Sequence, residues 1–353
     1  MPALPLQKLA PLLSLKYVSC GVLQDPSNAQ SIQDASRHAD EFRKAAQTSS
    51  GAESAARSLS SPRNQQPPPG LPQLDMDLLG SLSLRLQDVV INRGFDQDVI
   101  IVLGRVCSGL SQLAQHSQVY QNQLMTTPFL LEGVTAMLSS HSPEASAHAA
   151  LLLSQMALAS PESAERLILQ PSFMDALSSM IGGSYEVGVD TAALLANNCA
   201  GMGGVEVIGP MTQHAALMEV LVEKLGSGSP LQLQRIVSTM NHLSRSSVSA
   251  KQLRERRVPQ ILVRLTTRRE ESTTASAYKG LATMALANMV QKLNPASSTL
   301  NPTIYTLHFI FCILHPTPYI LHLSPYTLHP TPYTLHPTPH TLQPKPQTSN
   351  PKP

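Results

Sequence analysis

The amino-acid sequence predicts an all-α protein, a solenoid of about five stacked helical repeats. A five-residue pattern centred on a polar residue recurs five times, and successive copies are 43, 43, 44 and 46 residues apart. A period of this size is typical of stacked helical repeats. Aromatic residues form only 4% of the chain and Trp is absent. The core must therefore use Leu, Ala, Val, Ile and Met, a choice that favours helices over strands.

The repeated pattern has an apolar or small residue two positions before its polar centre and another directly after it. The five central residues are Gln112, Gln155, Asn198, His242 and Asn288. One helical face in the second copy is formed by Ala147, Ala150, Leu151, Ser154 and Leu158. Their spacing of three and four residues predicts an amphipathic helix around each centre.

Start and stop signals divide each repeat further. Residues 142–144 and 160–162 both read Ser-Pro-Glu, which offers an N-cap hydroxyl, a Pro at the first helical position and an acid in the first turn. Glycines at 182–183, 203–204, 226 and 228 indicate helix ends. A second apolar stretch in each interval ends near Leu138, Ile181, Leu225 and Leu265. Each repeat is therefore expected to hold at least two helices, with room for a short third.

Composition divides the chain into three segments. Residues 1–73 are rich in Ser, Ala, Gln and Pro, and we expect a disordered leader with at most a transient helix over 31–48. Residues 74–292 carry the repeats. Residues 293–353 contain no Asp or Glu and hold 13 of the 29 prolines. A seven-residue period there would suggest a coiled coil, but Pro in nearly every unit forbids a continuous helix, so we expect an extended or disordered tail.

The tail's period has a second interpretation. Its unit, Pro-Tyr-Thr-Leu-His-Pro-Thr, can be encoded by three copies of the seven-nucleotide word CCCTACA, which resembles telomere-type repeat DNA. Cys312 and His340 replace the expected Tyr, and Asn301 and Gln343 replace the expected His, each one base away. We therefore interpret residues 293–353 as translated simple-sequence DNA without a selected fold. The gene model is then expected to be truncated or mis-assigned near codon 293.

Charge, cysteines and hydropathy exclude several classes. The formal net charge of +2 indicates neither nucleic acid nor an anionic membrane as a partner. The four cysteines form no CxxC pair and are expected to be reduced, so we expect no disulfide framework, metal site or cofactor. Histidines seven residues apart in the tail offer no fixed metal geometry. No apolar run is long enough to span a membrane. A cytoplasmic location is expected, with the nucleus as the alternative.

The spacing and the small/Leu-x-Asn/Gln-Leu-Ala pattern resemble the armadillo-repeat family over residues 74–292. HEAT repeats are the nearest alternative. The resemblance implies three helices per repeat in a right-handed superhelix. It also implies that the third helices line a concave groove where the Asn of the motif holds the backbone of an extended peptide. The partner-binding residues would then be Gln112, Gln155, Asn198, His242 and Asn288, which we call the polar ladder. A row that only caps or spaces the helices is the structural alternative.

Nuclear-import armadillo adaptors carry a Trp four residues before the Asn. The corresponding positions here are Ser108, Leu151, Leu194, Ser238 and Met284. An import-type groove for basic peptides is therefore not expected.

A second candidate surface is a run of basic residues after the fourth ladder position. It comprises Lys251, Arg254, Arg256, Arg257, Arg264, Arg268 and Arg269, with only Glu255 among them. The run is either a solvated helix face with its loop or a docking patch for an acidic partner or phosphate.

The sequence contains no catalytic motif. It lacks a Gly-x-Ser-x-Gly elbow, a His-Glu-x-x-His pair and a dinucleotide fingerprint. We expect a non-catalytic, monomeric adaptor that binds an extended peptide or a helix of a protein partner along its concave face. The alternatives are a structural cytoskeletal or axonemal subunit and the armadillo part of a larger enzyme such as a ubiquitin ligase.

Overall fold

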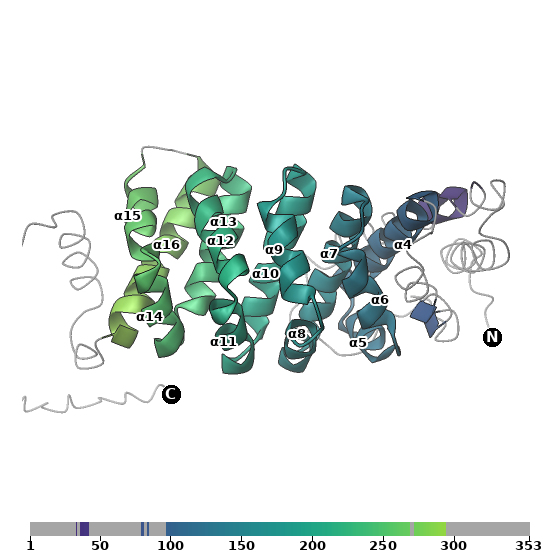
Figure 1. The fold of residues 1–353 in the computed structure, drawn as a ribbon, viewed down its shortest axis with the longest axis horizontal. Helices are drawn as coiled ribbons and strands as arrows, with labels where there is room; N and C mark the ends of the chain where they lie inside the picture. Colours follow the sequence, from purple (N-terminus) through teal and green to yellow (C-terminus); the bar gives the residue numbers. More distant parts are fainter. Residues whose placement is uncertain are drawn as a thin grey trace, which may run out of the picture. The chain divides into compact units, whose positions relative to one another are not determined.

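The computed structural model describes residues 97–268 and 272–293, together with residue 33 and residues 36–41, 79–80 and 83–84. These residues hold thirteen numbered helices, α4 to α16, and no strand (Figure 1). The array thus overlaps the predicted repeat region, 74–292. The expected seven-residue tail and most of the expected leader lie outside the described residues.

The thirteen helices repeat in sets of three. The first helices of the sets are α5 (Gln118–Thr126), α8 (Pro161–Ile168), α11 (Val205–Gln213) and α14 (Ser247–Glu255). The second helices are α6 (Leu130–Met137), α9 (Phe173–Gly182), α12 (Ala215–Ser227) and α15 (Val258–Thr267). The third helices are α4 (Gln97–His116), α7 (Pro143–Ala157), α10 (Glu186–Met202), α13 (Pro230–Leu243) and α16 (Thr273–Leu293). Four complete sets therefore follow one leading third helix, and all five copies of the pattern lie on third helices.

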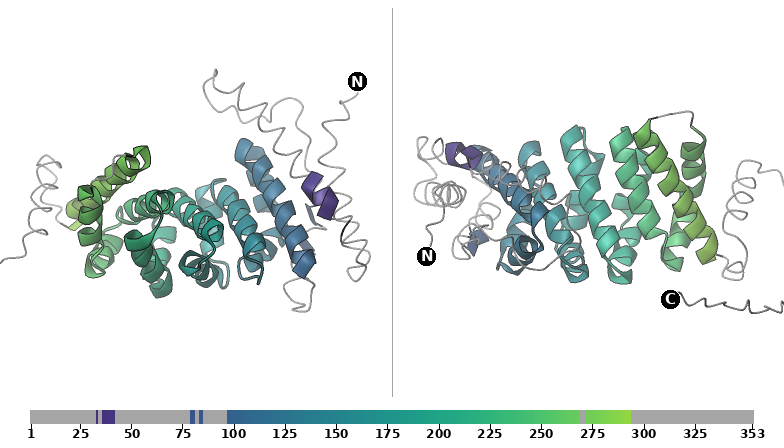
Figure 2. Two further views of the ribbon diagram at one scale, coloured as in Figure 1. Left: turned by 90° about the horizontal axis from the view of Figure 1, so that it is seen from above. Right: turned by 180° about the vertical axis from the view of Figure 1, so that it is seen from behind.

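Helices of one kind stack on one another along the array. The third helices contact in chain order, α4 to α7, α10, α13 and α16. They run side by side in Figure 2, from blue to yellow-green. The second helices α9, α12 and α15 contact in the same way, as do the first helices α8, α11 and α14. Each repeat therefore buries its apolar faces against the next, which is how stacked repeats obtain a continuous core.

Serine caps fix where several helices begin. Ser142 and Ser160 cap α7 and α8, and their Oγ atoms accept hydrogen bonds from the N–H groups of Ala145 and Ser163 at 3.3 and 3.2 Å. Ser229 caps α13 with a full capping box. In each case Pro occupies the first turn. The Ser-Pro-Glu signals are thus confirmed as helix starts.

Glycines end several helices where the sequence predicts. Gly183, Gly203 and Gly228 follow α9, α10 and α12, and all three have extended backbone. The chain therefore leaves these helices through extended residues, without a left-handed C-cap.

The core is aliphatic and continuous through the array. Its largest fully buried side chains are mostly Leu, with Tyr278, Phe173 and Met137 among them. Cys107 and Cys199 are buried in this core, and burial raises the pKa of each thiol to about 12. These two cysteines therefore have the buried, reduced state predicted for them, whereas Cys20 and Cys312 lie outside the described residues.

The N-caps of the second helices take two forms. Phe129, Ser172 and Arg257 have left-handed backbone, with φ of 59°, 60° and 60°. His214, the N-cap of α12, has φ −72° and caps the helix with its ring. A capping side chain thus replaces the left-handed turn in one repeat of the four.

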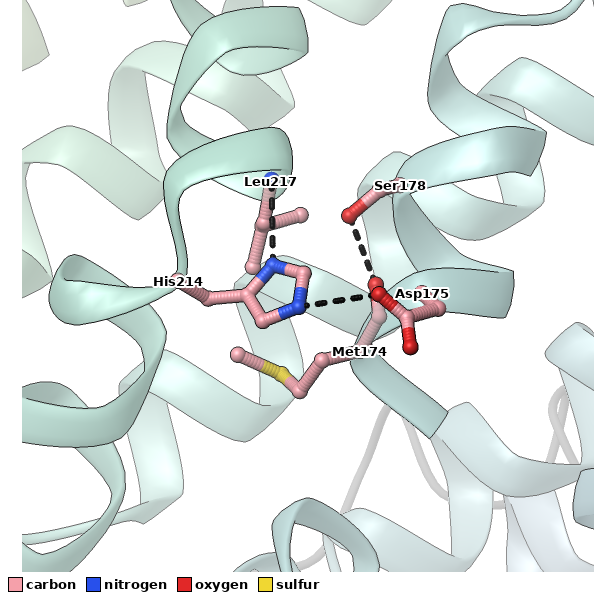
Figure 3. A network of polar contacts seen from close by, with 5 residues as sticks. All are labelled: Met174, Asp175, Ser178, His214 and Leu217. Atoms are coloured by element: carbon pink, nitrogen blue, oxygen red, sulfur yellow. Dashed lines mark hydrogen bonds and ion pairs between the residues drawn. The ribbon is translucent and has the colours of Figure 1, made fainter. Parts of the chain in front are cut away.

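His214 joins two neighbouring repeats (Figure 3). Its Nδ1 accepts a hydrogen bond from the Leu217 N–H at 3.2 Å, and its Nε2 lies 3.1 Å from Asp175 Oδ1 on α9. Because Nδ1 is an acceptor, the proton of the neutral ring lies on Nε2, which donates to the carboxylate. The histidine therefore caps α12 and ties it to α9.

A short part of the predicted leader packs against the array. Residues 36–41 are helical, and Ala39 is fully buried as part of the core. Arg105 on α4 donates to Ser36 Oγ at 2.6 Å and to Asp40 Oδ2 at 3.1 Å. This helical segment lies within the range 31–48 where the sequence allows a transient helix, and it makes defined contacts with α4.

Candidate binding face on the third helices

The polar ladder lies in register on consecutive third helices. Gln112, Gln155, Asn198, His242 and Asn288 occur on α4, α7, α10, α13 and α16, and every one of them is half-buried. Since these helices contact in chain order, the five side chains form one row across the array. We call the side of the array that carries this row the third-helix face.

Two residues of the polar ladder donate hydrogen bonds to the preceding third helix. The Nδ2 of Asn198 donates to the Ser154 carbonyl at 3.0 Å. The Nδ2 of Asn288 donates to Asn241 Oδ1 at 3.0 Å. Each amide therefore links adjacent repeats, as the structural alternative expects. An amide still has a second N–H and its own oxygen for another partner.

His242 occupies the fourth rung as a half-buried ring. Its Nδ1 is buried and makes no hydrogen bond to a described residue. Burial lowers the pKa of His242, and the positive charge of Arg245 lowers it further. The ring packs over Gly201 of α10, where a Cβ would lie 3.2 Å from Nε2. Because the ring favours its neutral form, it offers both a donor and an acceptor nitrogen.

The row four residues before the ladder is uncharged and partly apolar. Ser108 is buried, Leu151, Leu194 and Ser238 are half-buried, and Met284 is 55% exposed. Leu and Met stand where import adaptors would carry Trp, so this row offers apolar contacts without a cage of aromatic rings.

The structure adds a polar seam between α10 and α13 to the predicted ladder. Arg235 donates to the Asp190 carbonyl at 2.6 Å, and the two side chains also attract each other electrostatically. Asp190 Oδ1 and Asn197 Oδ1 are buried and accept no hydrogen bond from a described residue. Together with His242, the middle of the third-helix face thus contains three buried polar atoms that make no hydrogen bond within the described part of the chain.

Sequence reasoning missed this seam because it followed one residue per repeat. The signal was present as adjacent polar pairs at the pattern's centre, Asn197-Asn198 and Asn241-His242. The first two copies have Ser before the central Gln, and the last has Ala. Two adjacent amide or imidazole side chains thus occur only in the α10 and α13 copies of the pattern, which distinguishes them from the Ser-Gln and Ala-Asn copies.

The basic residues of the sequence lie on other helices. Lys251 and Arg254 are on α14, Arg256 and Arg257 are at the turn into α15, and Arg264 is on α15. Arg268 directly follows α15, and Arg269 lies outside the described residues. The structure therefore places the basic residues on a first and a second helix, separate from the third-helix face.

Solved structures match this chain, although no protein-family model and no curated protein does. An engineered protein, Northeast Structural Genomics Consortium target OR329, is 17% identical with a TM-score of 0.59, covering 79% of this chain and 97% of its own. The designed armadillo repeat protein YIII(Dq)4CqI is 20% identical with a TM-score of 0.52, covering 67% and 100%. The designed armadillo repeat protein YIII(Dq.V1)4CPAF, in complex with peptide (KR)4, is 20% identical with a TM-score of 0.51, covering 67% and 98%.

This chain has an armadillo-like repeat fold. At identities of 17–20% the likeness concerns the fold alone. The three helices in each complete repeat agree with the armadillo-like arrangement and not with the two-helix HEAT alternative.

The armadillo-like array also has a cleft of about 570 Å³ between its first and second complete helix sets. The cleft is bounded by the loop after α6 and by α9 with the start of α10, and its walls include His141, Asp175, Tyr185 and several Ser residues. No ladder or basic-run residue lines it. Among the residues that line it, Asp175 is the one carboxylate and His141 the one imidazole.

Two kinds of feature are absent from the described part of the array. The described residues contain no group of three or more His, Cys, Asp or Glu that could hold a metal ion. No helix within them is long and apolar enough to cross a membrane.

Proposed function

We propose that this armadillo-like array is a non-catalytic scaffold that binds an extended peptide of a protein partner on its third-helix face. The observation that carries the proposal is the row of five half-buried polar side chains on five contacting helices. Packed helices lie about 8–10 Å apart and an extended chain advances about 3.3 Å per residue. A peptide that crosses all five third helices would therefore have roughly 10–12 residues.

The chemistry of the row suits recognition of a peptide main chain. Asn198 uses one N–H in its bond to Ser154, so a second N–H and the carbonyl oxygen remain for a peptide group. An unpaired buried polar atom costs about 1–3 kcal/mol. The unpaired atoms of Asp190, Asn197 and His242 therefore favour the α10–α13 seam as the centre of the site.

The face is suited to a peptide with few charges and some apolar side chains. Leu151, Leu194 and Met284 supply partly exposed apolar contacts. The charges of Arg235 and Asp190 lie together. A designed armadillo neighbour is in complex with a (KR)4 peptide, which gives a precedent for peptide binding by this fold. The missing Trp row argues for a different class of peptide here.

Selection from a display library of random peptides of about 12 residues on the full chain tests the proposal. Selected peptides are expected to lose at least roughly tenfold in affinity for Asn198→Arg, because a long cation replaces the central amide. Gln213→Arg is the matched control, since Gln213 is exposed on the first helix α11. It adds the same charge away from the face and should leave binding unchanged. Circular dichroism should show equal helicity in both variants.

A different result is expected if the protein is instead a structural subunit that binds its partners through its first and second helices. Its binding would be insensitive to Asn198→Arg. Selected peptides that bind both variants and the parent chain equally would therefore contradict the peptide-groove proposal and favour the structural alternative.

A further inference from the structure

The near-neutral net charge of the chain hides a strong separation of charge along the array. Residues 97–244 contain eleven acidic and four basic residues, whereas residues 245–293 contain three acidic and ten basic residues. The last repeat is therefore as positive as the preceding part of the array is negative. Such a separation creates a local field that net charge does not reveal.

The positive charge is concentrated on the first and second helices of the last repeat, α14 and α15. Lys251 and Arg254 are three residues apart on α14, and both are exposed. Arg257 and Arg264 are seven residues apart at the start and in the body of α15, and both are also exposed. The buried residues of these helices, such as Leu253 and Leu262, face the core instead. The basic side chains thus lie on the solvent side of two contacting helices.

These cations have no ion-pair partner within the described residues. The ion pairs there involve His38, Arg105 and His214, none of which is on α14 or α15. Glu255 lies beside Arg254 and Arg256 in the chain, and no ion pair joins these three described residues. Guanidinium groups that have no carboxylate partner among the described residues repel one another, and an external anion relieves that repulsion.

We propose that the exposed face of α14 and α15 is a second docking surface, and that it binds a short acidic peptide segment of a partner protein. The surface consists of the exposed Lys251, Arg254, Arg257 and Arg264 together with the half-buried Arg256. Four of the five are Arg, whose planar guanidinium can hold a carboxylate with two hydrogen bonds. The ten residues of α15 span about 15 Å, which matches roughly four or five residues of extended peptide.

Two observations favour a short acidic peptide over a nucleic acid. Neither α14 nor α15 contains an aromatic residue, so no side chain on them can stack on a base. The first and second helices of the preceding repeat carry exposed acidic residues, including Glu206 on α11 and Glu219 and Glu223 on α12. A long polyanion that extended from the last repeat over the preceding one would meet these carboxylates. A short acidic segment fits within the basic surface.

The test is fluorescence anisotropy with the full chain and a labelled peptide of roughly six alternating Asp and Glu residues. The matched control peptide has Asn and Gln at the same positions. We expect binding of the acidic peptide only, with an affinity that falls as salt is raised. The double variant Arg254→Glu/Arg264→Glu should lose at least roughly tenfold in affinity, since both changes are at exposed helix positions and reverse the charge.

Two control variants show whether acidic-peptide binding depends on this basic surface. Lys224→Glu on α12 makes the same kind of charge change and should alter affinity by less than about twofold. Asn198→Arg should leave acidic-peptide binding intact, because the third-helix face is a separate surface. Failure of either proposal is therefore distinguishable from failure of the other. Equal binding of the Asn/Gln peptide, an unchanged affinity in the double variant, or tighter binding of duplex DNA or anionic vesicles would overturn the proposal.

Discussion

The guanidinium of Arg105 lies 3.1 Å from the carboxylate of Asp40, although the two residues are 65 positions apart. Arg105 is seven residues before its ladder residue, and Arg235 is in the same position three repeats later. Arg235 reaches back to Asp190 on the preceding third helix. Residues 36–41 thus give Arg105 a partner in the place that α10 takes for Arg235, although Arg105 bonds a carboxylate and Arg235 bonds the backbone carbonyl of Asp190. Terminal repeats of a solenoid need such a cap, because one face lacks a neighbour.

Disrupting this cap should loosen α4 and leave the far end of the array intact. Ala39→Glu places a charge at a fully buried site, so we expect the segment to detach. Amide hydrogen exchange in α4 should then become faster, while exchange in α16 stays the same. Asp40→Ala should have a smaller effect, costing about 0.2–1 kcal/mol, because the ion pair is partly exposed.

Ala277→Glu is the matched control for the cap, since Ala277 is exposed on α16. It should leave the exchange of α4 unchanged. Equal exchange of α4 in the parent chain and in Ala39→Glu would show that residues 36–41 do not cap the array.

Alanine substitution at two glycines that occupy equivalent positions in different repeats should change the stability of the chain in opposite directions. A Cβ on Gly104 would lie 2.8 Å from the Cα of Ala145, so α4 and α7 must move apart. We expect Gly104→Ala to destabilise the chain by about 1–3 kcal/mol. A Cβ on Gly280 would meet no atom within 4 Å, so Gly280→Ala should stabilise by about 0.5–1 kcal/mol.

Urea unfolding followed by circular dichroism measures both glycine variants. The urea midpoint of each variant is compared with that of the parent chain, with the dependence of the unfolding free energy on urea required to be equal. An unchanged or higher midpoint for Gly104→Ala would contradict the close helix packing at Gly104.

The repeat architecture could be predicted because its signals are local. The spacing of the pattern, the Ser-Pro-Glu triplets and the glycine stops each involve a few neighbouring residues, and the structure has helices where they predict them. Apart from α8, whose Ser-Pro-Glu start is visible in the sequence, the first helices gave the weakest signals, since they have only nine residues each. Short helices hold few apolar positions, so the sequence allowed a third helix per repeat without locating it.

The contacts of the candidate site could not be predicted because they join residues in different repeats. The bond between Asn241 and Asn288 spans 47 positions, and its geometry depends on how α13 and α16 pack. The sequence placed Asn288 in a row but did not show that its amide bonds the preceding repeat. The attachment of residues 36–41 to α4 depends on packing across an even longer separation. Periodicity thus identified the third-helix face, and tertiary packing decided which polar groups on it are already paired.

The two core cysteines should be unreactive until the array unfolds. Burial raises the pKa of Cys107 and Cys199 to about 12, so almost no thiolate exists at neutral pH. In the variant Cys20→Ser/Cys312→Ser, a thiol-specific chromogenic reagent should react with both remaining thiols only after urea is added. Rapid labelling of the native chain would show that α4 or α10 opens readily.

His242 should make the stability of the array fall when the pH is lowered. Burial and Arg245 lower its pKa in the folded state, so below about pH 6.5 the unfolded chain takes up a proton that the folded chain resists. Stability linked to this residue is therefore complete above about pH 6.5. It decreases as the pH falls from there toward the folded-state pKa. His242→Asn keeps a polar side chain at this ladder position but removes the titrating group. The decrease in the urea midpoint of unfolding between pH 7.5 and 5.5 should therefore be smaller in this variant than in the parent chain. His141→Asn, at an exposed histidine, should retain the full loss. If His242→Asn has the same pH dependence as the parent chain, the imidazole is not held in its neutral form by the α10–α13 seam.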